Sequence, residues 1–181
     1  DLYLLMDRFS YVKTVDAATY ERNKETAEQE GLTVLACKNT DKLLFFSSNG
    51  MQYGVKNQDI PFGKFRDKAV PLANISGFDP SRETICLIMT EKGLEEAHLV
   101  FLTKKGYLKR MDGKDLMGRN KVMQATKFKT EDDSLHAIEI IGSLADEIQK
   151  TNTVLWTKNV YFLRIPTEAI AKQKKNSCGT E

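Results

Sequence analysis

The sequence predicts an all-β protein of about four propeller-like blades with little helix, and a repeated block is the main reason. A block of 19 residues aligns four times without a gap, with copies starting near residues 2, 42, 98 and 152. These starts are 40, 56 and 54 residues apart, and a period of about 40–50 residues with several short strands is typical of propeller blades. A duplicated hairpin inside an ordinary β-barrel or sandwich is the alternative. We expect residues 1–181 to form one domain.

Each copy of the block predicts a β-hairpin. Three apolar residues, such as Leu44–Phe46 or Val100–Leu102, precede a turn, and an unbroken apolar run is typical of a strand covered on both faces. The turns of the second and third copies end in Gly50 and Gly106, and glycine tolerates the positive φ of tight hairpin turns. The other two copies lack this glycine. The next position is expected in the blade core and is aromatic or methionine: Tyr11, Met51, Tyr107 and Tyr161.

The links between the hairpins predict more strands and few helices. Asp16 and Thr167 are suitable helix N-caps, so we expect short, mostly solvated helices over Ala17–Glu30 and Thr167–Lys175. Apolar segments in the links would complete blades of roughly four antiparallel strands. These strand candidates are Leu32–Lys38, Ala69–Ile75, Thr84–Thr90, Val122–Phe128 and Leu135–Ile141.

The composition excludes several classes of site. Three widely spaced cysteines and two histidines without ligand spacing fit a reducing compartment and predict no metal site. The sequence has no phosphate-binding loop and no nucleophile paired with a base, so we expect no catalytic residues. It has no apolar run of 18 residues and no cleavable leader, so no membrane segment is predicted. The chain starts at Asp1 rather than methionine, and we expect it to be a piece of a longer polypeptide.

Charge follows the repeat. Residues 98–129 contain nine Lys/Arg and two acids, whereas residues 131–147 contain six acids and no Lys/Arg. Because equivalent turns of a blade array lie at equivalent heights, a basic turn position predicts a discontinuous positive stripe along the perimeter. Such a stripe suits the phosphates of a long polyanion; the alternative is that these charges only keep the protein in solution. The turn position is occupied by Arg8, Ser48, Lys104 and Lys158.

The second copy resembles a known repeat. Lys42–Val70 reads as an apolar strand, a glycine turn, a second strand, a landing at Ile60-Pro61 and then Arg66. This order resembles the repeat in the C-terminal domain of bacterial type IIA topoisomerase A subunits, which are those of DNA gyrase and topoisomerase IV. The resemblance extends over essentially the whole chain. The third copy keeps the order without the proline, at Leu116, Arg119 and Lys121.

The resemblance implies a β-pinwheel, in which neighbouring blades exchange strands and duplex DNA bends around a basic outer rim. Four copies are fewer than the six typical of gyrase, so it implies a shorter or truncated pinwheel whose ring can be open. It also implies non-sequence-specific DNA binding and bending or wrapping within an ATP-dependent enzyme that controls DNA topology. The expected contacts are Arg8, Lys13, Lys56, Lys64, Arg66, Lys68, Lys104, Lys105, Lys109, Arg110, Arg119, Lys121, Lys158 and Arg164.

The parent enzyme and its partners are also implied by the resemblance. The partners are double-stranded DNA, the N-terminal breakage–reunion domain of the same polypeptide, and the ATPase B subunit. ATP and Mg²⁺ are expected elsewhere in the parent enzyme, with no cofactor in this domain. The expected location is the bacterial cytoplasm, at the nucleoid.

One departure from the gyrase pattern favours a topoisomerase IV-like protein. The A subunits of gyrase carry a Gln-Arg-Arg-Gly-Gly-Lys-Gly box, and the comparable stretch here, Ala18–Gly31, has no such box. The C-terminal domain of a gyrase A subunit is the alternative within the family. A propeller-type module that binds a protein in an apolar groove is the alternative of another class, and an enzyme with its site in a propeller channel is a third.

Overall fold

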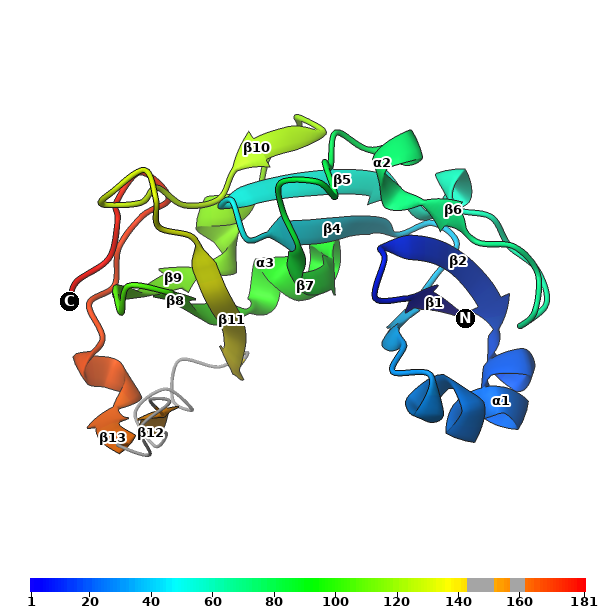
Figure 1. Cartoon of the computed structure of the whole chain (residues 1–181), viewed down its shortest axis with the longest axis horizontal. Helices are drawn as coiled ribbons and strands as arrows, with labels where there is room; N and C mark the ends of the chain where they lie inside the picture. The colour runs from blue at the N-terminus through cyan, green and yellow to red at the C-terminus, as the bar shows by residue number, and fades with distance from the viewer. Residues whose placement is uncertain (143–151, 157–161) are drawn as a thin grey trace.

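The computed structural model describes residues 1–142, 152–156 and 162–181. Its sheets follow one another along an open arch (Figure 1). The strand β1 (Leu2–Met6) lies toward one end, and the hairpin of β12 (Asn152–Trp156) and β13 (Phe162–Pro166) lies toward the other. The described sheets do not close into a ring, so the predicted all-β blade array is confirmed as an open one.

The blades are small antiparallel sheets built around hairpins. The first has the strand order β3-β1-β2-β6, the second β10-β5-β4-β7 and the third β11-β8-β9. The predicted strands over 32–38, 84–90 and 135–141 are confirmed as β3, β7 and β11. The strand bounds are β2 (Tyr11–Asp16), β3 (Thr33–Cys37), β4 (Lys42–Ser47), β5 (Met51–Lys56), β6 (Val70–Pro71), β7 (Ile85–Thr90), β8 (His98–Thr103), β9 (Leu108–Asp112), β10 (Val122–Gln124) and β11 (Leu135–Gly142).

Each blade is completed by a segment from the next repeat. β6 follows the second hairpin in sequence but pairs with β2 of the first blade. β10 follows the third hairpin but pairs with β5 of the second blade. The segment after the fourth hairpin runs beside β9, where the backbone N–H of Arg110 donates to the carbonyl of Ala171 at 3.0 Å. This repeated exchange in one direction is the pinwheel arrangement that the resemblance implied.

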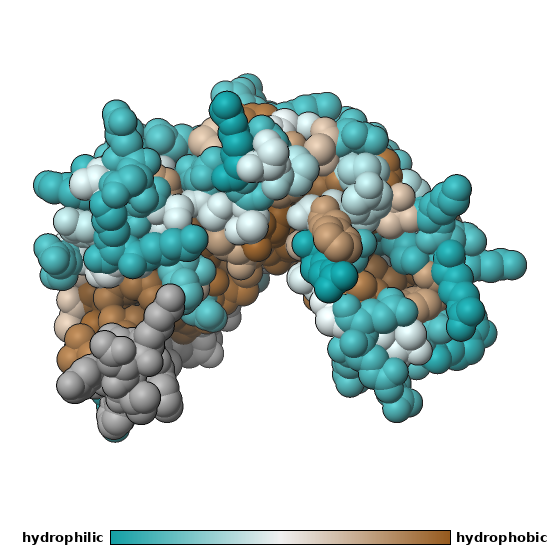
Figure 2. Space-filling view, viewed as in Figure 1, coloured by the Kyte–Doolittle hydropathy of each residue, from teal (hydrophilic) through white to brown (hydrophobic). Residues whose placement is uncertain are grey.

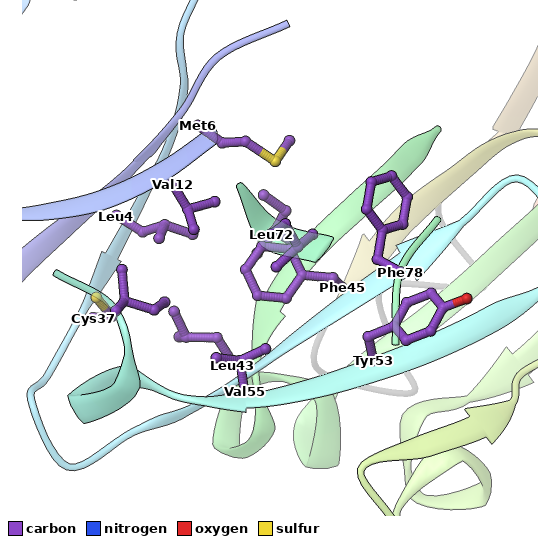
Figure 3. Packing of buried hydrophobic residues seen from close by; sticks show 12 residues of the cluster. Leu4, Met6, Val12, Cys37, Leu43, Phe45, Tyr53, Val55, Leu72 and Phe78 are labelled. Atoms are coloured by element: carbon purple, nitrogen blue, oxygen red, sulfur yellow. The ribbon is translucent and has the colours of Figure 1, made fainter. Parts of the chain in front are cut away.

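The faces of neighbouring blades pack against each other. Leu4 of the first blade joins Leu43 and Phe45 of the second in one apolar cluster (Figure 3). Leu44, on the opposite face of β4, joins Phe101 of the third blade in another cluster. Because side chains alternate between the two faces of a strand, a blade buried on both faces needs the unbroken apolar run that the sequence shows.

Helix α1 (Ala17–Gln29) follows the first hairpin in the sequence, at the place where the later hairpins are followed by an exchanged segment. Asp16 caps it as predicted, since its Oδ1 accepts from the backbone N–H of Thr19 at 2.7 Å. Ala27 of α1 packs with Leu5 and Val15 on the remaining face of the first blade. The helix therefore covers the face that a neighbouring blade covers elsewhere. The other helical segments are α2 (Leu72–Ile75), α3 (Glu91–Glu96), η1 (Asn57–Asp59), η2 (Gly113–Leu116) and η3 (Thr167–Ala169).

The first hairpin turn closes without a glycine. Ser10 adopts a φ of 62°, in the same region as the 74° of Gly50, and Oδ1 of Asp7 supports the turn by accepting from the backbone N–H of Tyr11 at 3.0 Å. At Gly50 the exchanged segment also approaches closely. A Cβ there would lie 2.8 Å from the carbonyl oxygen of Thr126, so this turn needs glycine for two reasons.

Three of the predicted elements were wrong in type or length. Residues 167–175 form the short η3 and then an extended segment. The backbone N–H of Gln173 donates to the carbonyl of Arg110 in β9, so it does not make a hydrogen bond within a helix. The strand expected over 69–75 ends at Pro71 and continues as α2. The strand expected over 122–128 ends at Gln124.

Parts of the expected core are exposed. Tyr11 is 42% exposed because it emerges from the turn at the end of the blade, beyond the packed faces. Val154 and Leu163 are 45% and 55% exposed, since β12 and β13 pair only with each other among the described strands. Tyr161 and the fourth turn lie outside the described residues.

Candidate nucleic-acid interface

The exchanged segments form the convex edge of the arch. We define them as residues 61–71, 117–129 and 171–180, which follow the second, third and fourth hairpins. The exchanged β6 and β10 are edge strands of their sheets, and Figure 1 shows them on the convex side, with β7 and β11 toward the concave side. A long ligand lying along the convex edge would therefore meet the exchanged segments in succession.

The convex and concave sides of the arch also differ in hydropathy. Figure 2 shows mostly hydrophilic residues along the convex side of this view, whereas apolar residues gather toward the concave side. The exchanged segments carry ten Lys/Arg and one acid, Asp67. The carboxylate of Asp67 is engaged within its own loop, where it accepts from the backbone N–H of Lys64 at 2.7 Å. The convex edge is therefore strongly basic.

Most of these bases are free to meet a ligand. Lys172 pairs with Asp112 at 2.6 Å, and Lys174 lies 3.9 Å from Asp115. The other eight make no ion pair with any residue that the structure describes, and all are exposed except the half-buried Lys175. These eight are Lys64, Arg66, Lys68, Arg119, Lys121, Lys127, Lys129 and Lys175.

Two of the expected contact residues hold the exchanged segments in place. Lys13 and Lys109 occupy the same column of the repeat. The ammonium group of Lys13 donates to two backbone carbonyls of residues 61–71, and that of Lys109 donates to the carbonyls of Lys174 and Ser177 at 3.2 and 2.9 Å. Lys109 is only 2% exposed, and burial lowers its pKa to about 8. Lys109 is therefore not part of the outward-facing basic surface.

Two other expected contacts are engaged within the protein. Nε of Arg110 donates to the carbonyl of Ile170 at 3.1 Å, directly before the exchanged segment 171–180 that Lys109 also holds. Nζ of Lys105 contacts Asp132 at 2.5 Å, and this hydrogen bond lowers the pKa of the Asp132 carboxyl. The acidic link after the third hairpin thus folds back onto the basic turn, although the sequence pattern had separated the two.

The basic turn position of the repeat contributes only isolated charges to the described surface. Arg8 and Lys104 are exposed, but Ser48 is buried and its Oγ accepts from the backbone N–H of Thr84 at 3.0 Å. Lys158 lies outside the described residues. Ten of the expected contacts are exposed: Lys105, which is paired with Asp132, and Arg8, Lys56, Lys64, Arg66, Lys68, Lys104, Arg119, Lys121 and Arg164.

Sequence reasoning missed half of the exchanged bases. Their signal was their place after the apolar landing of each hairpin, the same signal that led to Arg66 and Arg119. In the fourth copy the expected helix over 167–175 concealed this relation. The missed residues are Lys127, Lys129, Lys172, Lys174 and Lys175.

The buried polar cluster of the second blade is structural. The carboxylate of Glu83 accepts from Ser47 Oγ and Tyr53 Oη, each at 2.5 Å, and from the backbone N–H of Asp79 at 3.0 Å. Burial and this carboxylate raise the pKa of Tyr53, so its phenol stays protonated. Within the described residues, no three His, Cys, Asp or Glu side chains group as metal ligands. None of the described helices has the length and apolar character needed to cross a membrane.

Comparisons with known sequences point to one family. Residues 97–141 match the family model of the DNA gyrase C-terminal domain, a β-propeller. The chain is 28% identical over 152 residues to the DNA gyrase A protein of Staphylococcus epidermidis, which covers 77% of this chain and 17% of the relative. It is 22% identical over 192 residues to the DNA gyrase A protein of Staphylococcus aureus, which covers 99% of this chain and 21% of the relative. The chain thus spans about a fifth of the length of these relatives.

Solved structures share the fold. The C-terminal domain of DNA topoisomerase IV superposes with a TM-score of 0.81 at 19% identity, covering 99% of this chain and 56% of that one. The Escherichia coli ParC C-terminal domain superposes with a TM-score of 0.72 at 16% identity, covering 98% of this chain and 69% of that one. The chain is thus similar in sequence to DNA gyrase A proteins, and its exchanged blades share the fold of the C-terminal domains of DNA topoisomerase IV and ParC.

Proposed function

We propose that the chain binds duplex DNA without sequence specificity and bends it along the convex edge. The carrying observation is the charge of the exchanged segments, where eight bases make no ion pair with any described residue. Lysine and arginine side chains that neutralise phosphates release counterions, and this release drives binding. Phosphate contacts position DNA but carry no sequence information, so all duplexes should bind alike.

The curvature of the array supports bending. A straight duplex touches a convex edge only near its middle, so DNA must curve to reach all three exchanged segments. Bending a site of 20–30 base pairs by 40–90° costs about 1–6 kcal/mol. Phosphate contacts at the outer blades would offset this cost.

A salt titration with a distance readout tests the proposal. We would measure binding of the chain to 30-base-pair duplexes of unrelated sequence between 50 and 200 mM salt, with fluorophores on both duplex ends. We expect similar affinities for all sequences, a loss of about 10³–10⁵-fold across this range, and shorter end-to-end distances on binding. A salt-independent affinity, or no binding at 50 mM salt, would refute the proposal. The rival protein-interaction module predicts little salt sensitivity.

We further propose that the parent protein is the DNA-cleaving polypeptide, the gyrase A or topoisomerase IV A type, of an ATP-dependent type II topoisomerase. The DNA gyrase A relatives and the fold shared with a topoisomerase IV domain support this proposal. The bent DNA would be presented to the breakage–reunion domain of the same polypeptide, and the ATPase B subunit would complete the enzyme. ATP and Mg²⁺ would bind in those parts, and the enzyme would act at the nucleoid in the bacterial cytoplasm.

Within the family, we favour a topoisomerase IV-like activity over gyrase activity. The stretch after the first hairpin lacks the box that the resemblance associates with gyrase, and α1 occupies this stretch instead. The complete enzyme is expected to relax supercoiled DNA with ATP but not to introduce negative supercoils. ATP-dependent negative supercoiling would instead establish the gyrase alternative.

A further inference from the structure

We infer that Phe62 acts as a wedge that inserts between base pairs of duplex DNA bound at the first blade, an inference that rests on the proposed function. Phe62 lies on the first exchanged segment and is 62% exposed. Single exposed apolar side chains are common on protein surfaces, so exposure alone assigns no role. Its fixed backbone, its absence from the core and its charged surroundings single it out.

The backbone on both sides of Phe62 is anchored to β2. The N–H of Thr14 donates to the carbonyl of Pro61 at 2.8 Å, and the N–H of Gly63 donates to the carbonyl of Thr14 at 3.1 Å. Thr14 is 1% exposed, so this anchor lies inside the blade. Lys13 holds the far side of the same loop through two backbone carbonyls. A side chain presented from a fixed backbone loses little conformational entropy on binding.

Phe62 has no packing role that would explain an aromatic residue. Phe65, three positions later, is 8% exposed and packs with Leu5 and Val15. Phe62 belongs to none of the three apolar clusters found among the described residues. The loop is thus held to the blade by Phe65, and Phe62 remains on its outside.

The surroundings of Phe62 suit the DNA backbone. Lys64, Arg66 and Lys68 are exposed on the same loop. None of them makes an ion pair with a residue in the described ranges. A duplex held through its phosphates by these three side chains would lie against Phe62. Phenylalanine is among the residues that DNA-bending proteins insert between base pairs, where they unstack a step and kink the duplex by about 20–90°.

The register of the exchanged segments places Phe62 where another blade has a cation. Phe62 bridges to Thr14 of β2 in parallel, and Lys172 bridges to Arg110 of β9 in parallel. Phe62 and Lys172 therefore occupy equivalent positions on the first and third blades. The third blade places a cation at this position, and the first blade places an aromatic ring there. A kink at one end of the curved edge would lower the cost of bending over the rest of the site.

The test compares the complete chain with three variants on one duplex probe. The probe is a 30-base-pair duplex with a TA step in each helical turn, 2-aminopurine at these steps and fluorophores at the two ends. Phe62→Ala removes the wedge, and Phe62→Leu keeps an apolar wedge of another shape. Phe9→Ala is the matched control, because Phe9 is 63% exposed but lies in the first hairpin turn. All variants should melt at the wild-type temperature, since neither side chain is buried.

We expect wild-type binding to raise 2-aminopurine fluorescence and to shorten the end-to-end distance. Phe62→Ala should abolish the fluorescence rise and weaken binding roughly tenfold. It should also leave the bound duplex less bent, with a longer end-to-end distance than in the wild-type complex. Its salt dependence should stay unchanged because no charge is lost. Phe62→Leu should keep most of the bend, and Phe9→Ala should behave as wild type.

Two outcomes would overturn the inference. One is a Phe62→Ala variant with wild-type 2-aminopurine fluorescence and bend, which would leave the proposed function intact. The other is an equal loss of both signals in Phe9→Ala, which would show that the effect is not specific to this position. By contrast, a wild-type chain that fails to bind the duplex at 50 mM salt would refute the proposed function itself.

Discussion

The second exchanged segment offers the clearest test of where DNA binds. Residues 117–129 contain four exposed bases and no acid. If each of the eight exchanged bases without an ion pair in the described structure neutralises one phosphate, log K should fall against log salt with a slope of about −7. Replacing the four bases by glutamine should reduce this slope to about −3.6. The substitutions are Arg119→Gln, Lys121→Gln, Lys127→Gln and Lys129→Gln.

The assay is fluorescence anisotropy of a labelled duplex between 50 and 200 mM salt. Over this fourfold range, the loss of affinity should shrink from about 10⁴-fold in the wild type to about 10²-fold in the variant. The control removes the same charge outside the exchanged segments, by glutamine at the exposed Arg22, Lys24, Lys38 and Lys92. A wild-type slope in the first variant, or the same drop in the control, would refute the assignment of the interface to the exchanged segments.

Three further predictions concern the fold that carries this surface. Gly50→Ala should lower the free energy of unfolding by about 2–3 kcal/mol in urea titrations, because φ is 74° and the new Cβ would meet the carbonyl of Thr126. A loss below about 0.5 kcal/mol would show that the exchanged segment moves away from the new Cβ at little cost. Phe45→Ala should cost about 3–5 kcal/mol, because the ring is fully buried between the first two blades, and a loss under about 1 kcal/mol would contradict that packing. For Lys109, whose pKa falls to about 8 from 10.5, the folded chain releases a proton that the unfolded chain keeps between these pH values. The stability of the wild type relative to Lys109→Met should therefore rise with pH across this window, by up to about 3 kcal/mol, and a difference independent of pH would refute the burial of this ammonium group.

The parts of the fold that depend on local pattern could be predicted from the sequence. The unbroken run Leu44–Phe46 predicted a strand covered on both faces, and these side chains do alternate between two clusters. Gly50 predicted a hairpin turn, and Asp16 predicted the start of α1. In each case the residues that decide the conformation lie within a few positions of each other, which is the range that periodicity and turn chemistry report.

The partners of the exchanged segments could not be predicted from local pattern. β10 pairs with β5, about 70 residues earlier in the chain, and only the family resemblance implied such an exchange. Lys109 illustrates the consequence for the site. A lysine on a hairpin strand usually faces solvent, but here the incoming segment buries its side chain and accepts its hydrogen bonds. The same segment, residues 171–180, carries exposed bases of its own, Lys172 and Lys174.

The central claim is that DNA lies along the exchanged segments, and lysine footprinting tests it most directly. The chain would be acetylated briefly with and without a 30-base-pair duplex at 50 mM salt, and each lysine would be quantified by mass spectrometry. We predict protection of Lys64, Lys68, Lys121, Lys127 and Lys129, with unchanged reactivity at Lys24, Lys38 and Lys92. Equal protection of both groups, or protection of the second group alone, would contradict this account.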